Sequence, residues 1–351
     1  MNGIHIAVDL AKSVFQIVEC TALGKILSRK RLNRTEFNHY LIQPHENATI
    51  IMEACGTAHY WGRVAQAAGH RVVLLHPHYV KPHRRRNKTD RNDSDAIFNA
   101  SRAVGIKPVP VKTGLQQQIQ QLHCMREMWK CNRNQRINLL RGILREHGYD
   151  NAAKTQDFLR QCSDAIHSVE LKALAPQMHI VLAEIQHLSE WMATSEQQLN
   201  QLLAQDAIIE RIDEVSGIGV LTASAFVAAI GTPERFKNGR MVSAWLGMTP
   251  KEFSSGTRRK LGAISLAGNV YVRTLMIHGA RSALLAAKRC AARTPEKLTR
   301  LQQWAIQACD RIGFNKATVA LANKMVRISW AIWKHARQFD GNYVPHVNRV
   351  V

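Results

Sequence analysis

Several features that define other protein classes are missing from this sequence of 351 residues. It has no apolar run of the roughly 18 residues that a membrane-spanning helix needs. Its first residues lack the basic segment and long apolar core of a secretory signal. Its seven cysteines include no Cys-x-x-Cys pair, which argues against a zinc ribbon or a disulfide framework. These absences predict a cytoplasmic protein, and the length predicts about two domains.

Acidic residues are scarce relative to basic ones. The chain has 48 Lys and Arg against 26 Asp and Glu, a formal net charge of +22. The excess is concentrated at the end of the chain, since residues 251–351 hold 18 Lys and Arg and four acids. Such a surplus predicts a polyanionic partner. Nucleic acid is favoured over a membrane surface, because no basic amphipathic anchor stands out.

The pattern of apolar residues divides the chain into three parts, 1–112, 113–206 and 207–351. The first part alternates strands with helices, which predicts an α/β layer domain. Its expected strands are at 4–8, 14–18, 26–27, 48–52 and 72–75, and its expected helices are near 34–41, 57–68 and 92–104. The second part predicts an antiparallel pair of long helices broken near 147–152, either a spacer or a dimerising coiled coil. The third part is predicted to be helical and basic.

Four carboxylates of the first part are candidates for a metal site. Asp9 and Glu53 end two apolar strands, so both can lie at one edge of a sheet. Asp90 and Asp93 are three residues apart at the start of a predicted helix and can share one face. Converging carboxylates require a cation, and Mg²⁺ or Mn²⁺ suits oxygen ligands and phosphodiester chemistry. Taken singly, each acid also fits an ordinary surface or helix-terminus role, and Asp95 is an equally good exposed acid.

Two further segments have the composition of phosphate contacts. A basic loop contains Lys81, Arg84, Arg85, Arg86 and Lys88. We expect these cations to meet phosphates, although a solvated charge run looks the same. Gly217 and Gly219 precede an apolar helix, as in a helix–hairpin–helix clamp whose backbone N–H groups bind phosphate. A tight turn between two helices also uses glycine, so this signal is weak alone.

The last candidate is a serine followed by glycine and three cations. Ser255 precedes Gly256, and Arg258, Arg259 and Lys260 follow. A serine nucleophile would conserve the phosphodiester as a protein–DNA ester, and arginines stabilise charge on a phosphoryl group in transfer. From spacing alone a polar turn is the simpler interpretation, and the neighbouring Ser254 stays open as the alternative serine.

Together these motifs resemble the DEDD transposases of the IS-one-ten insertion-sequence family, whose relatives include the Piv site-specific invertases. The similar blocks are residues 8–12, 52–61, 87–93, 244–256 and 315–327. The resemblance implies that the metal-binding acids are Asp9, Glu53, Asp90 and Asp93, and that Ser255 is the nucleophile. It also implies a basic pair where this chain has Leu266 and Ala267. A phosphate contact is therefore either lost or relocated to Arg273.

The resemblance further implies a RuvC-like, RNase H-type first domain, a coiled-coil linker and a mainly helical transposase domain. Its site would be composite, with carboxylates from one protomer of a dimer or tetramer and serine from another. A structured bridge RNA would pair with donor and target DNA. We therefore expect a Mg²⁺-dependent recombinase that moves an insertion sequence at the bacterial nucleoid without ATP. The alternatives are a hydrolytic nuclease of the junction-resolvase type and a non-enzymatic nucleic-acid-binding scaffold.

Overall fold

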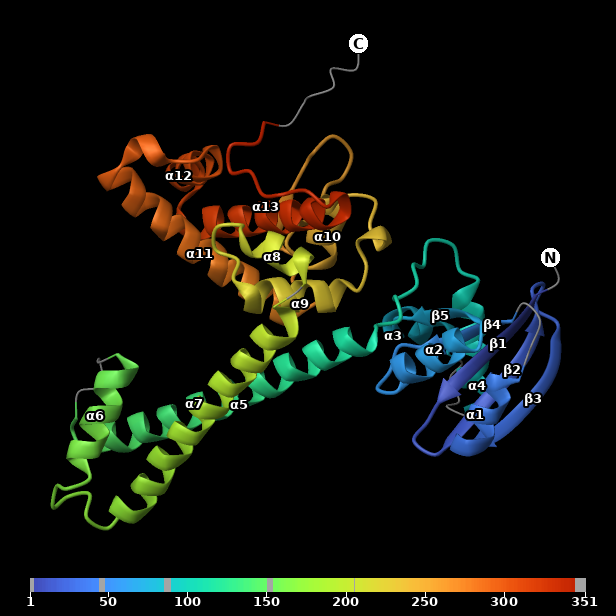
Figure 1. Ribbon diagram of the computed structural model, residues 1–351, viewed down its shortest axis with the longest axis horizontal. Coiled ribbons are helices and arrows are strands. Elements are labelled where there is room, and N and C mark those ends of the chain that lie inside the picture. Colours follow the sequence, from blue (N-terminus) through green and yellow to red (C-terminus); the bar gives the residue numbers. More distant parts are fainter. Residues whose placement is uncertain (1–2, 44–47, 85–89, 150–153, 205, 345–351) are drawn as a thin grey trace. The chain divides into compact units, whose positions relative to one another are not determined.

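The chain forms two compact units (Figure 1). The computed structural model describes residues 3–43, 48–84, 90–149, 154–204 and 206–344, and for 90–92 the backbone alone. The first unit contains residues 1–117 and 230–235, and the second contains residues 118–229 and 236–351. The expected helices of 113–206 and those of 207–351 thus fall largely in one unit, and the three-part division stays a prediction.

A five-stranded sheet forms the centre of the first unit. Its strands are β1 (Ile4–Leu10), β2 (Val14–Thr21), β3 (Ile26–Asn33), β4 (Thr49–Glu53) and β5 (Arg71–Leu75). The strand order is β3-β2-β1-β4-β5. The first three strands are antiparallel, and β1, β4 and β5 are parallel neighbours. The expected strands and the mixed α/β class are confirmed.

Helices cover both faces of this sheet. They are α1 (Arg34–Ile42), α2 (Ala58–Ala67), α3 (Pro77–Val80), α4 (Asp90–Ser101) and the 3₁₀ turn η1 (Lys81–His83). Asn33 caps α1 by accepting from the Glu36 N–H, while Glu36 accepts from the Asn33 N–H. This capping box fixes where α1 begins.

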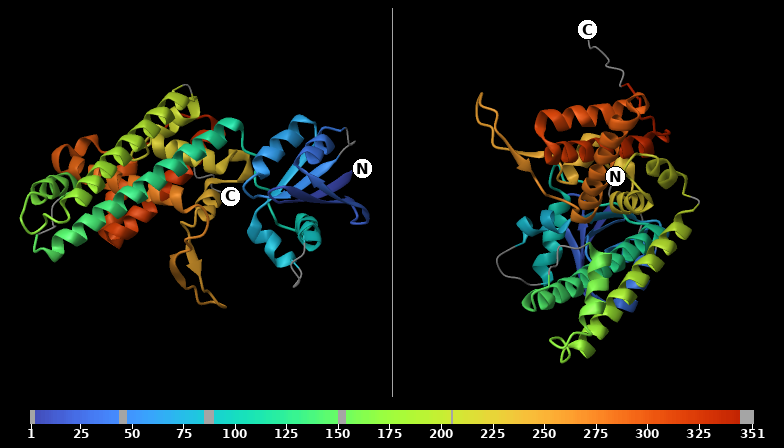
Figure 2. Two further views of the ribbon diagram at one scale, coloured as in Figure 1. Left: turned by 90° about the horizontal axis from the view of Figure 1, so that it is seen from below. Right: turned by 90° about the vertical axis from the view of Figure 1, so that its left-hand side faces the viewer.

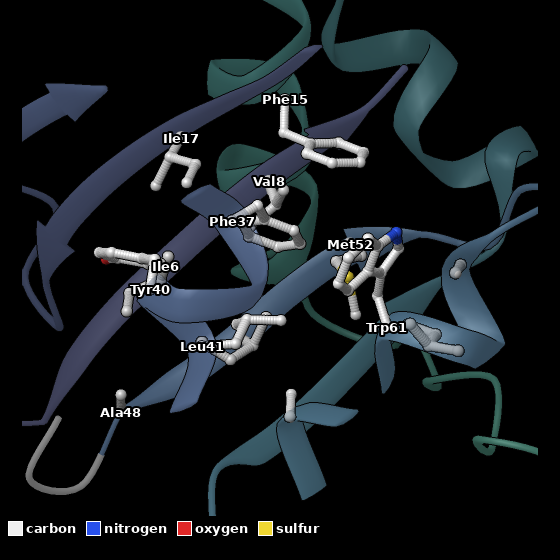
Figure 3. Close-up of a cluster of buried hydrophobic side chains, with 14 residues drawn as sticks. Ile6, Val8, Phe15, Ile17, Phe37, Tyr40, Leu41, Ala48, Met52 and Trp61 are labelled. Carbon is white, nitrogen blue, oxygen red and sulfur yellow. The ribbon is translucent and has the colours of Figure 1, made fainter. Parts of the chain in front are cut away.

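Large aromatic side chains fill the core between the sheet and helices α1 and α2 (Figure 3). Phe15 lies 4.7 Å from Phe37 and 5.4 Å from Trp61, measured between ring centroids. All three side chains are fully buried. On the other face, Ala7 and Ile51 pack with Ile97 of α4. The sheet is therefore covered on both sides, which fixes the carboxyl ends of its parallel strands.

Helices make up most of the second unit. They are α5 (Gly114–Glu146), α6 (Thr155–Ala165), α7 (Ala175–Leu203), α8 (Ala207–Asp213), α9 (Val220–Ile230), α10 (Gly239–Trp245), α11 (Val270–Arg293), α12 (Arg300–Ile312) and α13 (Phe314–His335). The first residues of α5 and the last residue of α9 belong to the first unit. None of the described helices is both long enough and apolar enough to cross a bilayer.

Helices α5 and α7 form the expected antiparallel pair. Arg126 of α5 pairs with Glu196 of α7 at 2.6 Å, and ten residues further along α5 Arg136 pairs with Glu184 at 2.7 Å. Helix α6, which the sequence did not predict, packs Phe158 into the end of this pair.

The C-terminal part contains one element that breaks its helical character. Strands β6 (Pro250–Glu252) and β7 (Leu261–Ile264) form an antiparallel hairpin. This hairpin projects from the helices of its unit (Figure 2). The sequence did not predict it, because both strands are short, largely exposed and without alternating apolar residues.

Candidate active site

Two of the expected acids lie near the carboxyl ends of neighbouring parallel strands, Asp9 one residue before the end of β1 and Glu53 at the end of β4. Val8 of β1 is the register partner of Met52 in β4, so Asp9 and Glu53 follow side by side. Alternate residues of a strand point to opposite faces. Asp9 and Glu53 therefore lie on the same face as Ala7 and Ile51, the face that α4 covers. The strand register thus places the two acids next to each other, and their role as metal ligands stays a prediction.

Helix α4 brings a third acid to this place. Asp93, on the first turn of α4, is 8% exposed. The Arg84 guanidinium joins it to the sheet: Nη2 donates to Glu53 Oε2 at 2.8 Å, and Nε lies 3.3 Å from Asp93 Oδ1. Asp95, the open alternative, instead pairs with Arg29 at 2.9 Å. Glu53 and Asp93 are thus the acids that share a cation.

Arg84 was expected to meet phosphate with the other cations of its loop. In this structure it neutralises carboxylates instead, which the charge pattern alone did not predict. Lys81 is exposed on η1. Arg85, Arg86 and Lys88 lie outside the described residues, as does the side chain of Asp90.

The sequence reasoning missed one residue beside these acids. His76 directly follows β5, whose last residue Leu75 is the register partner of Glu53. Burial lowers the pKa of His76, the charges of His78 and Arg235 lower it further, and Glu53 opposes them. The signal was available, because His76 follows an apolar strand just as Asp9 and Glu53 end theirs.

The carboxylates suit a hard divalent ion in their chemistry. Glu53 and Asp93 offer only oxygen donors, and they already converge on one positive group. Among the described side chains no group of three acids, histidines or cysteines is arranged to hold an ion. Glu53 and Asp93 are held by Arg84 in this structure, and a divalent ion would have to displace that guanidinium from them.

The hairpin of the second unit presents the two adjacent serines differently. Ser254 Oγ donates to Glu252 Oε1 at 2.7 Å and accepts from the Lys260 N–H at 3.1 Å. Ser255 and Arg258 close the turn by two backbone hydrogen bonds of 3.2 and 3.1 Å. The exposed Ser255 hydroxyl makes no hydrogen bond to any described residue. Ser254 is engaged in the hairpin, whereas Ser255 is available.

Cations surround this turn. Arg258, Arg259 and Lys260 are all exposed, and the Arg259 Nε lies 3.8 Å from Glu252 Oε1. Gly256 adopts φ +55°, and the space beside it is open. A phosphate could approach the Ser255 hydroxyl and these side chains without moving other groups.

Packing accounts for one of the two glycines before α9. Gly217 has φ +87°, and a Cβ there would collide with the carbonyl oxygen of Gly279 in α11. Gly219 is different, because its nearest outside atom would be the Asp213 carboxylate at 3.9 Å. The phosphate-binding role of this turn stays a prediction.

Arg273 does not have the environment that the sequence reasoning expected. It is 5% exposed, and its Nη1 donates to the carbonyl oxygens of Leu246 and Ala267 at 2.8 and 2.7 Å. Its guanidinium holds the loop containing Leu266 against the end of α10. Arg273 was expected to contact phosphate, but in this structure it is buried and stabilises the loop.

Comparison with known proteins identifies related chains over nearly the whole length. Residues 209–294 match the family described as "Transposase IS116/IS110/IS902 family", and residues 6–148 match the DEDD transposase family of IS110 type. A probable family 20 transposase of Pseudomonas aeruginosa is 35% identical over 336 residues, 95% of this chain and 97% of its own.

Two other relatives agree with this match. The transposase for insertion sequence element IS1111A of Coxiella burnetii is 34% identical, covering 93% of this chain and 88% of its own. The transposase for IS1328 of Yersinia enterocolitica is 29% identical, covering 97% and 99%. With acids converging at a sheet edge and a free serine on a basic hairpin, the chain belongs to the IS116/IS110/IS902 family and is a DNA transposase of the DEDD type.

Proposed function

We propose that this transposase cuts and rejoins insertion-sequence DNA through a covalent bond between Ser255 and a DNA phosphate. The observation that carries the proposal is the difference between two adjacent serines. Ser254 is held by Glu252 and Lys260, while the exposed Ser255 hydroxyl has no partner among the described residues. Attack by its Oγ forms one P–O bond while the P–O bond to one deoxyribose oxygen breaks, and that leaving oxygen takes up the proton that the serine loses. The number of phosphoester bonds is unchanged, so no ATP is needed.

The carboxylates would serve the same reaction. Asp9, Glu53, Asp90 and Asp93 would hold Mg²⁺ or Mn²⁺, which stabilises charge on the attacking and leaving oxygens when bound. Without the metal ion, Arg84 neutralises the charges of Glu53 and Asp93. The strand order β3-β2-β1-β4-β5, with acids at the ends of β1 and β4, supports an RNase H-type, RuvC-like first domain.

The partners follow from charge and from the family. The net charge of +22 supports binding of donor and target DNA and of a structured guide RNA encoded by the element. Exposed cations at Lys81, Arg258, Arg259 and Lys260 are the proposed phosphate contacts within the described residues. We place the active protein at the nucleoid as a dimer or tetramer.

A covalent-adduct assay tests the nucleophile. Purified protein, the element-derived RNA, matching donor and target DNA, and Mg²⁺ are mixed, denatured and analysed by mass spectrometry. We expect DNA attached to the peptide containing Ser255 in the wild type and in Ser254→Ala, and none in Ser255→Ala. Cut DNA with free ends and no adduct would instead identify a hydrolytic nuclease that uses water.

A further inference from the structure

A pocket in the second unit contains none of the residues of the candidate active site. It has a volume of about 820 Å³ and is lined by α10, α12, α13 and the segment that follows α13. That segment is fixed to the start of α12, because Gly341 O accepts from the Leu301 N–H and Asn342 Oδ1 accepts from the Arg300 N–H, both at 3.0 Å. The pocket is therefore a built feature, and its size is within the range of small-molecule sites.

The charge of the pocket selects an anion. Five of its described lining residues are cations: Arg240, Arg300, Lys324, Arg327 and Arg337. Among the same residues there is one acid, Asp340, whose carboxylate already accepts from the Asn342 N–H at 2.8 Å. Burial lowers the pKa of Lys324, and the nearby charge of Arg327 lowers it further. Crowded cations without acidic partners favour a negatively charged ligand.

The other lining residues select a planar, hydrogen-bonding ligand. Within the part of the chain that the structure describes, four aromatic side chains line the pocket: Trp304, Trp330, Phe339 and Tyr343. Lys324 Nζ lies 4.2 Å from the centroid of the half-buried Trp304 ring, which places a cation beside an aromatic surface. The amides of Gln307 and Gln338 supply both donors and acceptors. An anion with a flat, polar ring would suit the cations, the aromatic side chains and the amides of this lining.

We infer that this pocket binds an unpaired nucleotide of a single-stranded nucleic acid. The cations hold its phosphate, an aromatic ring stacks on its base, and an amide pairs with the base edge. A base inside a duplex cannot enter, because its faces are covered by its neighbours. Lys324 and Arg327 also lie in block 315–327, which the proposed strand-transfer chemistry leaves without a role. The inference does not depend on Ser255.

Binding of short oligonucleotides to the full-length protein tests this assignment. Fluorescence anisotropy is measured with fluorescein-labelled oligothymidylate and oligouridylate, which distinguish DNA from RNA as the source of the nucleotide. We expect Trp304→Ala to weaken binding about tenfold and Trp304→Phe to retain most of it. Lys324→Gln should weaken binding more than Lys288→Gln, a matched loss of charge at an exposed site on α11.

Three results would overturn the inference. In the first, Trp304→Ala and Lys324→Gln bind no more weakly than Lys288→Gln. In the second and third, duplex DNA, or oligoglutamate as an acidic peptide, displaces the part of the binding that depends on Trp304 as well as the single strand does. If Trp304→Ala does not fold, the wild-type protein is photocrosslinked to iodouridine-containing oligomers instead. We then expect the crosslinks to lie on residues that line the pocket, and crosslinks found elsewhere alone would overturn the inference. The assay measures binding of a short oligomer and not formation of a DNA adduct, so failure here is distinct from failure of the serine mechanism.

Discussion

Arg84 is the residue on which the candidate metal site depends in this structure. Its guanidinium bonds Glu53 and approaches Asp93, and it is 38% exposed at its side chain. Such a partly exposed pair contributes only about 1 kcal/mol or less to stability. The greater effect is electrostatic, because a fixed positive charge between two carboxylates competes with a divalent ion.

Replacing Arg84 should therefore allow Mg²⁺ to stabilise the protein at a lower concentration. We expect Arg84→Gln to shift the midpoint of the Mg²⁺-induced rise in Tm to about threefold to tenfold lower concentration. Arg29→Gln is the matched control, since it removes an arginine from an ion pair with Asp95 on the same helix. Differential scanning fluorimetry measures both. Equal midpoints for Arg84→Gln and wild type would contradict the role of Arg84.

A buried histidine makes stability depend on pH. His123 is 4% exposed, and its ring nitrogens contact the Tyr271 hydroxyl and Ser224 Oγ, each at 3.0 Å. Burial lowers the pKa of His123 to about 4, and the charge of Arg126 contributes less. In the unfolded chain this pKa is about 6.5, so between these values the unfolded state takes up the proton first. Stability is complete above about pH 6.5 and falls as pH decreases.

The loss should be on the order of 1–3 kcal/mol by about pH 4. His123→Gln has no titrating ring, so it should be less stable near neutral pH but should lose less on acidification. Urea denaturation at a series of pH values measures both proteins, and their difference isolates His123 from the other titrating groups. Parallel curves for the two proteins would rule out this contribution.

The acids were predictable from sequence because their signal is local. Asp9 and Glu53 lie at the ends of apolar strands, and the parallel register of β1 and β4 places them next to each other. The pairing of Arg84 with Glu53 was not predictable, because it joins residues 31 apart through tertiary structure. Residue spacing alone also could not separate Ser254 from Ser255, because their hydroxyls differ through the hairpin around them.

Among the elements, long regular ones were the easiest to predict. The α5–α7 pair follows from helical spacing of apolar residues over many turns. Helix α6 was missed, and so was the β6–β7 hairpin, whose strands have three and four residues. The two strands carry too few residues to display a period, and they are held by their pairing with each other. Helix α6 is different, because it has 11 residues and buries Phe158, Cys162 and Ala165 at helical spacing, so its period is present in the sequence.

The close contact between α11 and the turn before α9 can be tested by substitution of its glycines. An alanine in the interior of a helix normally stabilises it relative to glycine. At Gly279 the sign should reverse, because a Cβ there would collide with the carbonyl oxygen of Gly217. We expect Gly279→Ala and Gly217→Ala each to lower stability by about 2–4 kcal/mol, measured by urea denaturation.

Gly219→Ala is the control for the same turn. Its Cβ would meet nothing closer than 3.9 Å, so its stability should stay near that of the wild type. A folded Gly219→Ala protein that binds DNA more weakly would support the proposed phosphate contact. If Gly279→Ala melted like the wild type, the close backbone contact would not constrain this turn.

For the whole molecule, the question is how acids and serine reach one phosphate. Glu53 belongs to the first unit and Ser255 to the second. In the proposed composite site the carboxylates of one protomer work with the serine of another. Two inactive variants with complementary defects then contain, in a mixed oligomer, one site in which both Glu53 and Ser255 are intact.

Mixing Glu53→Gln with Ser255→Ala should therefore restore recombination. Each variant alone should be inactive, and an equal mixture of dimers should recover about a quarter of wild-type activity, because half of the dimers are mixed and each has one intact site. Glu53→Gln mixed with the double variant Glu53→Gln/Ser255→Ala is the control and should stay inactive, since no chain supplies the carboxylate. Native mass spectrometry verifies that mixed oligomers form. If they form and the first mixture remains inactive, the acids and the serine act within one chain.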